Sequence, residues 1–197
     1  IEIKEINNLN SYSLFNIEYE GDYKIYLNDP RNINLGKKLI TDKKILIDKE
    51  RLKEINETEY HEILINHTTP YSPFDILENK SLLLENNFDN LNAIDWDKGC
   101  YVGQEITARM KYRGLLKKKL YALKIKSGDV LEGDELIVDN KKIGTIVSKA
   151  NSNIFAALNI NFVNEIKNKD QNLVINDSLS FDFLNWKFFS VKTYWNY

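Results

Sequence analysis

The sequence predicts an α+β protein in which a mixed N-terminal part is followed by a small β-barrel. Residues 50–65 and 104–113 carry apolar or charged side chains at the three- and four-residue spacing of helices. From Leu120 onward, apolar residues instead alternate with polar ones, as in strands. Short strands at close spacing are typical of a barrel or a sandwich. We therefore divide the 197 residues into 1–114 and 115–197.

In the N-terminal part, residues 12–19 and 23–28 are predicted to be strands because apolar residues partly alternate there. Glu20-Gly21-Asp22 favours a turn between them. Asn28-Asp29-Pro30 ends the second strand, and residues 44–48 form a further short strand.

Neither histidine predicts a metal site. His61 and His67 are six residues apart, which does not place two ligands on one helix face, so both are interpreted as structural or solvated. Asp75 and Asp89 are interpreted as exposed acids.

The C-terminal part contains a series of stretches with a period of two residues, and Asp139-Asn140 favours a hairpin turn among them. The predicted strands are Tyr121–Ile125, Glu135–Val138, Ile143–Val147, Ile154–Leu158, Asn172–Ile175, Ser180–Phe183 and Lys187–Tyr194.

The composition, with 43% hydrophobic and 28% charged residues, is ordinary for a globular protein. A net charge of −2 does not indicate a general binder of polyanions. The single cysteine excludes an internal disulfide and fits a reducing compartment. No apolar run approaches the ~20 residues that span a bilayer, so no membrane partner is expected.

The stretch Lys98–Glu105 contains that cysteine, Cys100, with a glycine on either side. Glycines allow the chain to turn tightly into the helix predicted at 104–113. Cys100 would then lie at or near the helix N-terminus, where unpaired amides and Lys98 favour the thiolate, the form that attacks or binds metal. The alternative is that a lone cysteine is a small buried hydrophobe.

The same stretch resembles the K-G-C-Y-x-G-Q-E signature of YgfZ-like folate-binding proteins, relatives of the aminomethyltransferase (T-protein) of the glycine cleavage system. All seven specified positions match. Thr107-Ala108-Arg109, Tyr112-Arg113-Gly114, Asp29-Pro30-Arg31 and Leu35-Gly36 also look like the family. The resemblance covers nearly the whole chain and is strongest from Glu85 to Gly114.

The sequence departs from the family pattern before Pro70. Family members usually carry an arginine and a glycine there, where this chain has Leu64 and Thr68.

The resemblance implies a T-protein-like, ferredoxin-like body that binds tetrahydrofolate, followed by the barrel. The first part of that body is expected upstream of residue 1. Glu85, in Leu84-Glu85-Asn86-Asn87, resembles the T-protein glutamate that grips the pterin, because a carboxylate can accept two parallel hydrogen bonds from that ring. The remaining residues expected around the cofactor are Lys98, Tyr101, Gln104, Glu105 and Arg109, and no resident metal is expected.

The resemblance also implies an accessory factor that helps to make or repair iron–sulfur clusters, especially those of [4Fe–4S] enzymes including tRNA-modifying ones, rather than a classical enzyme. Cys100 would be the working thiolate. One thiolate cannot hold a cluster, which typically takes four ligands, so any cluster would be shared with an iron–sulfur carrier or client protein. We expect the protein in the cytoplasm, or in the mitochondrial matrix of a eukaryote.

Two alternatives remain open. The first is a folate-dependent aminomethyltransferase-type enzyme, although the T-protein lacks the K-G-C-Y-x-G-Q-E cysteine. The second is an RNA-binding module that uses the basic block 109–126, since eight basic and no acidic residues lie between Ile106 and Gly128.

Overall fold

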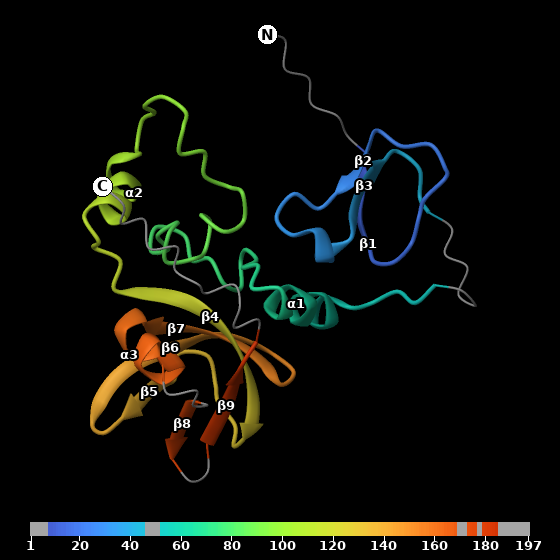
Figure 1. The fold of residues 1–197 in the computed structure, drawn as a ribbon. Coiled ribbons are helices and arrows are strands. Elements are labelled where there is room, and N and C mark those ends of the chain that lie inside the picture. Colours follow the sequence, from blue (N-terminus) through green and yellow to red (C-terminus); the bar gives the residue numbers. More distant parts are fainter. Residues whose placement is uncertain (1–7, 46–51, 169–172, 177–178, 185–197) are drawn as a thin grey trace. The chain divides into compact units, whose positions relative to one another are not determined.

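The structure, a computed structural model, describes residues 8–45, 52–168, 173–176 and 179–184. The chain forms two compact units, Ile1–Glu57 and Thr58–Tyr197. The first contains a three-stranded sheet and the second a six-stranded sheet (Figure 1). No helix in the described ranges combines the length and apolar character needed to cross a membrane. The division of the chain into residues 1–114 and 115–197 stays a prediction, as does the T-protein-like body.

The sheet of the first unit is antiparallel, with the order β1–β3–β2. β1 (Asn10–Leu14) and β2 (Ile25–Asn28) both pair with β3 (Lys37–Thr41). The predicted strands at 12–19 and 23–28 overlap β1 and β2, but the two are not neighbours, because β3 lies between them. β3 begins with two lysines and ends with a threonine, so its apolar signal is only two residues long.

The strand predicted at 44–48 is wrong where the structure describes it. Lys44 and Ile45 are irregular, and residues 46–48 lie outside the described residues.

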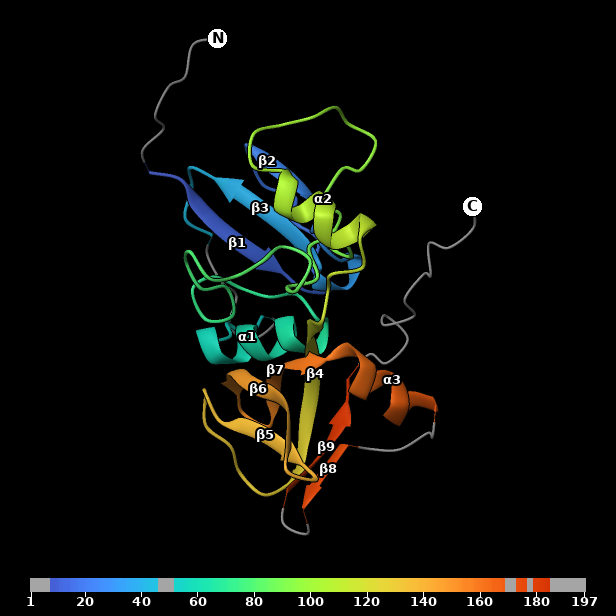
Figure 2. The ribbon, with the colours of Figure 1, turned by 90° about the vertical axis from the view of Figure 1, so that its left-hand side faces the viewer.

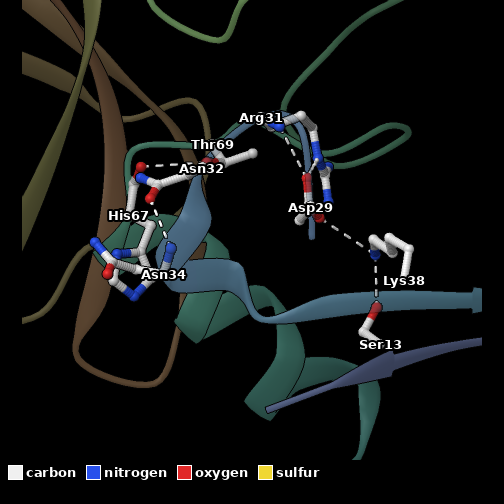
Figure 3. A network of polar contacts seen from close by, with 8 residues as sticks. All are labelled: Ser13, Asp29, Arg31, Asn32, Asn34, Lys38, His67 and Thr69. Atoms are coloured by element: carbon white, nitrogen blue, oxygen red, sulfur yellow. Dashed lines mark hydrogen bonds and ion pairs between the residues drawn. The ribbon is translucent and has the colours of Figure 1, made fainter. Parts of the chain in front are cut away.

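A buried carboxylate holds the connection between β2 and β3. Asp29, only 3% exposed, accepts hydrogen bonds from Arg31 Nε at 3.0 Å, Nη2 at 2.8 Å and the backbone N–H at 3.0 Å. Lys38 Nζ lies 3.6 Å from the same carboxylate and donates to Ser13 Oγ at 2.6 Å (Figure 3). Burial alone would raise the pKa of Asp29, but the hydrogen bonds from Arg31 and the positive charges of Arg31 and Lys38 together outweigh it and hold that pKa below its ordinary value.

The same connection contains a short 3-10 helix, η1 (Ile33–Leu35). Asn32 Oδ1 accepts a hydrogen bond from the Asn34 N–H at 3.0 Å and caps it (Figure 3). Gly36 follows with a φ of 70°, and a Cβ there would lie 2.0 Å from the Leu14 carbonyl oxygen. Only glycine fits this position, which gives the L-G pair of the sequence a structural reason.

The sheet of the second unit has the strand order β5–β6–β7–β4–β9–β8. Its outer strands, β5 and β8, approach one another, so the sheet is a nearly closed barrel (Figure 2). The strands are β4 (Lys118–Ser127), β5 (Glu135–Val138), β6 (Lys141–Ala150), β7 (Asn153–Asn159), β8 (Leu173–Asn176) and β9 (Leu179–Phe183). The predicted barrel strands are confirmed where the structure describes them, whereas Asn172 and Lys187–Tyr194 lie outside the described residues.

Two helices of the second unit precede the barrel. α1 spans Glu57–Asn66 and α2 spans Glu105–Tyr112. The helix predicted at 104–113 is confirmed. The prediction of 50–65 starts too early, because the described residues before Glu57 are irregular.

A third helix, α3 (Ile160–Asn168), follows β7 and was not predicted. The Asn159 side chain caps it by accepting hydrogen bonds from the backbone N–H groups two and three residues later, at 2.9 and 3.3 Å. Val163 and Ile166 are buried at a helical spacing of three residues. The cap and this spacing were the missed signal.

β4 is buried on both faces. Tyr121 and Leu123 point into the barrel core, while Leu120 and Ala122 pack with Ile65 of α1 on the other side. Because successive residues of a strand face opposite sides, β4 lies between the barrel interior and α1.

α1 ends in a Schellman motif with an unusual residue. The Thr69 N–H donates to the Leu64 carbonyl and the Thr68 N–H to the Ile65 carbonyl, both at 2.9 Å. Thr68 has a φ of 53°, the left-handed conformation for which glycine is preferred at this position. Thr68 is the position at which the family resemblance expects glycine.

Candidate functional site

Cys100 is exposed in an irregular segment before α2. The alternative that it is a buried, inert residue is therefore wrong. Cys100 lies five residues before Glu105, the first residue of the helix, so it is near the N-terminus rather than on it. Gly103 has a φ of 88° and provides the turn into the helix. The Gln104 side chain closes that turn, since its Oε1 accepts a hydrogen bond from the Tyr101 N–H at 3.2 Å.

Two side-chain pairs lie on either side of this turn. The Lys98 ammonium lies 4.5 Å from the centre of the Tyr101 ring, a cation–π contact. Glu105 and Arg109 form an ion pair one helical turn apart on α2. Five of the predicted cofactor residues thus form local contacts in the segment that contains Cys100.

α2 is held by its inner face and by one aromatic contact. Thr107 and Met110 are buried. Lys111 Nζ lies 3.5 Å from the centre of the Trp96 ring, and burial lowers the pKa of Lys111, although Asp97 acts in the other direction. These contacts position the helix and the loop before it.

Glu85 belongs to a second, separate cluster. Its carbonyl accepts a hydrogen bond from the Leu120 N–H at 2.8 Å, and its partly buried carboxylate lies 3.3 Å from Lys118 Nζ. Asn87 donates from Nδ2 to the Leu120 carbonyl at 2.8 Å, whereas its buried Oδ1 has no partner among the described residues. No hydrogen bond or ion pair within the described ranges joins this cluster to the Cys100 loop.

The sequence did not predict the buried polar cluster around Asp75. Asp75, predicted to be exposed, is 1% exposed. Its carboxylate accepts hydrogen bonds from His61 Nε2 at 3.0 Å, from the Tyr71 N–H at 2.7 Å and from Ser148 Oγ. The His61 ring also stacks on Phe74, with centres 5.1 Å apart. The cluster joins α1, the following loop and β6, which confirms the structural role of His61.

His67 and Asp89, the other histidine and the other acid considered in the sequence, are also partly buried. His67 is half-buried, and burial lowers its pKa. Its carbonyl accepts a hydrogen bond from Thr69 Oγ1 at 3.2 Å (Figure 3). Asp89 is partly buried and pairs with Lys119 Nζ at 3.1 Å, so its prediction as an exposed acid is wrong. Within the described residues, no group of three or more potential ligands could hold a metal ion.

Most of the basic block 109–126 has local partners. The contacts are Arg109 with Glu105, Lys111 with Trp96, Lys118 with Glu85, Lys119 with Asp89 and Lys126 with Asp182. These contacts lie within the second unit, which favours the connector interpretation of the block over an RNA-binding surface.

Comparison with known proteins finds named relatives. No protein-family profile matches the chain. This chain is 34% identical over 137 residues to the "Iron-sulfur cluster assembly factor IBA57 homolog, mitochondrial" of Dictyostelium discoideum. The aligned region covers 66% of this chain and 33% of that protein. This chain is similar to iron–sulfur cluster assembly factors.

Two mammalian relatives agree. The mitochondrial IBA57 proteins of Mus musculus and Homo sapiens are 32% and 31% identical over 101 and 109 residues. The matches cover 50% and 54% of this chain, and 28% and 30% of those proteins. The chain thus spans about a third of the length of the curated relatives that it matches. The names of these relatives agree with the iron–sulfur role that the resemblance of the cysteine motif implies.

Proposed function

We propose that this protein acts in iron–sulfur cluster assembly or repair, with Cys100 as the working thiolate. The observation that carries the proposal is the exposure of Cys100, in a turn that Gly103 and Gln104 define. A cysteine kept for packing would be buried. An exposed thiol is accessible to a metal centre on another protein. The names of the similar proteins supply the process.

Cys100 can contribute one bond to a cluster, as the thiolate, and its proton passes to solvent. The sequence has no second cysteine, so the remaining ligands belong to an iron–sulfur carrier or client protein. The proposed clients are [4Fe–4S] enzymes, including tRNA-modifying ones. The proposed compartment is the mitochondrial matrix in a eukaryote, since the relatives are named as mitochondrial.

Tetrahydrofolate is part of the proposal as a bound cofactor. A pterin edge presents a ring N–H and an amino group, which need acceptors. The partly buried Glu85 carboxylate and the buried, unpartnered Oδ1 of Asn87 are two such acceptors on one short segment. Both residues are fixed to Leu120 of β4. These residues fit a pterin, and the folate would position or protect the cysteine site.

The decisive experiment is complementation with the full-length protein in cells that lack it. Cys100→Ser should abolish [4Fe–4S] enzyme activity while the protein level and melting temperature stay unchanged, because serine is nearly isosteric but a poor ligand. Leu131→Ser, in an exposed loop of the barrel, is the matched control and should complement. Full activity of Cys100→Ser would refute the proposal.

Folate binding is tested separately, by titrating tetrahydrofolate into the full-length protein. Glu85→Ala should weaken binding by about 1.5–3 kcal/mol for each charged hydrogen bond lost. Unchanged affinity would remove Glu85 from the site.

A further inference from the structure

Two neighbouring lysines at the start of β4 form ion pairs with two acids earlier in the second unit, and the pairs differ in which partner is buried. Lys118 Nζ lies 3.3 Å from Glu85 Oε2, and Lys119 Nζ lies 3.1 Å from Asp89 Oδ2. The side chain of Lys119 is 13% exposed, whereas that of Lys118 is 56% exposed. Lys119 is therefore fixed in the protein. Lys118 can move into water at little cost, because an ion pair with an exposed lysine contributes little to stability.

The Glu85 carboxylate is the more buried partner of its pair, and most of its capacity as an acceptor is unused. The Glu85 side chain is 18% exposed. An ionised carboxylate can accept about four hydrogen bonds. Within the part of the chain that the structure describes, only the Lys118 ammonium pairs with this carboxylate, at Oε2. Glu85 is thus a partly desolvated acceptor that can still accept donors from a ligand.

A second unused acceptor lies two residues further along the chain. Asn87 is 1% exposed, and its Oδ1 has no hydrogen-bond partner among the described residues. Both residues are fixed to Leu120, which donates its N–H to the Glu85 carbonyl and accepts a hydrogen bond from Asn87 Nδ2, each at 2.8 Å. The protein therefore holds two acceptors in place, and the exposed Lys118 is the replaceable partner of one of them.

We infer that Lys118 competes with the ligand for Glu85: it neutralises the carboxylate in the free protein and leaves it when a planar ligand with two adjacent N–H donors binds. This inference rests on the folate part of the proposed function. An ammonium is a point charge, whereas such a ligand offers two parallel hydrogen bonds that match both carboxylate oxygens. The ion pair stabilises the partly buried charge of the free protein. Because the ligand binds only when Glu85 is released, the same ion pair lowers the apparent affinity.

The first test measures the affinity of the full-length protein for tetrahydrofolate by calorimetry. Lys118→Met keeps the length and the apolar stem of the side chain but removes the ammonium, so binding should become about two- to fivefold tighter. The control is Lys117→Met, which removes the same charge from the neighbouring exposed residue. Its affinity should be unchanged or lower, because the ligand is an anion. Equal or weaker binding by Lys118→Met than by the wild type would overturn the inference.

The second test follows the Lys118 amine directly, by acetylation with an N-hydroxysuccinimide ester and mass spectrometry. Saturating tetrahydrofolate should make the labelling of Lys118 at least about twofold faster, because the amine is released from its ion pair. Lys119 should be labelled at an unchanged rate, since the ligand does not use Asp89. Unchanged or slower labelling of Lys118 would contradict competition, because a lysine that contacts the ligand is protected by it.

The inference and the proposed function can fail separately. If the wild type binds tetrahydrofolate and Glu85→Ala weakens binding, but Lys118→Met binds no more tightly, competition is wrong and the pterin site stands. If neither the wild type nor Lys118→Met binds, the inference and the folate part of the proposed function are both wrong. The role of Cys100 is tested by complementation and is unaffected. Binding by Lys118→Met alone would support the inference, because the lysine would then exclude the ligand.

Discussion

The Asp75 cluster and the Cys100 loop both belong to the second unit and both contain side chains that can take part in catalysis, but their surroundings are opposite. Asp75 is buried, and donors from α1, a loop and β6 converge on its carboxylate. Cys100 is exposed, and its neighbours Tyr101, Gln104 and Lys98 form contacts with one another within the loop. An acid, a histidine and a serine in contact resemble catalytic machinery, but here they join three segments of the fold. The thiol is the exposed member of this comparison, which is why we propose it as the working residue.

The largest effect should come from removing the buried acid. Asp75→Ala leaves the donors of His61, Ser148 and Tyr71 without an acceptor, so unfolding by urea should show a loss of about 3–5 kcal/mol. Glu132→Ala, in an exposed barrel loop, should change stability by less than about 0.5 kcal/mol. Equal losses of stability in both variants would contradict the structural role of the Asp75 cluster.

A gain in stability is expected at the end of α1. Thr68→Gly removes a β-branched side chain from a left-handed conformation, together with a buried hydroxyl that has no partner in the described structure. The free energy of unfolding should rise by about 1–2 kcal/mol. Thr69→Gly is the control and should lower it, since Thr69 is buried and has no positive φ. A lower melting temperature for Thr68→Gly would contradict the Schellman assignment.

The first unit should lose stability in acid. The pKa of the Asp29 carboxyl is lower in the folded protein than its ordinary value, because burial, which raises it, is outweighed by the hydrogen bonds from Arg31 together with the charges of Arg31 and Lys38. Its contribution is therefore complete above the unfolded pKa of about 3.9 and disappears as the pH falls through the folded pKa. The protection factors of the amides in β2 and β3, which are corrected for the intrinsic pH dependence of exchange, should fall below about pH 4. Asp29→Asn, which cannot ionise, should flatten that profile, and identical profiles would exclude Asp29 as the cause.

The smallest effect on stability is expected at the cysteine. Cys100→Ser and Lys98→Ala should change the free energy of unfolding by less than about 0.5 kcal/mol, because both side chains are exposed. Iodoacetamide should label Cys100 in the folded protein at the rate of an exposed thiol, and Cys100→Ser should abolish that labelling. Protection of Cys100 from alkylation in the folded protein would contradict its exposure.

The sequence by itself determined the features that depend on near neighbours. The period of two residues after Leu120 identified the barrel strands, and the spacing of Glu105, Arg109 and Arg113 identified α2. The glycine motif singled out Cys100. Each of these predictions follows from side chains a few residues apart. Such side chains point to the same side of a helix or strand at regular intervals, so a local pattern is enough to identify the element.

The tertiary structure alone decided which segments meet. β3 separates β1 from β2 because sheet order depends on pairing between distant residues, which no local pattern encodes. Asp75 is buried because Ser148, 73 residues later, and His61 supply donors that offset the cost of removing a carboxylate from water. A carboxylate beside an aromatic residue in a loop has the same local pattern whether or not such donors await it, so only the fold could separate Asp75 from an exposed acid.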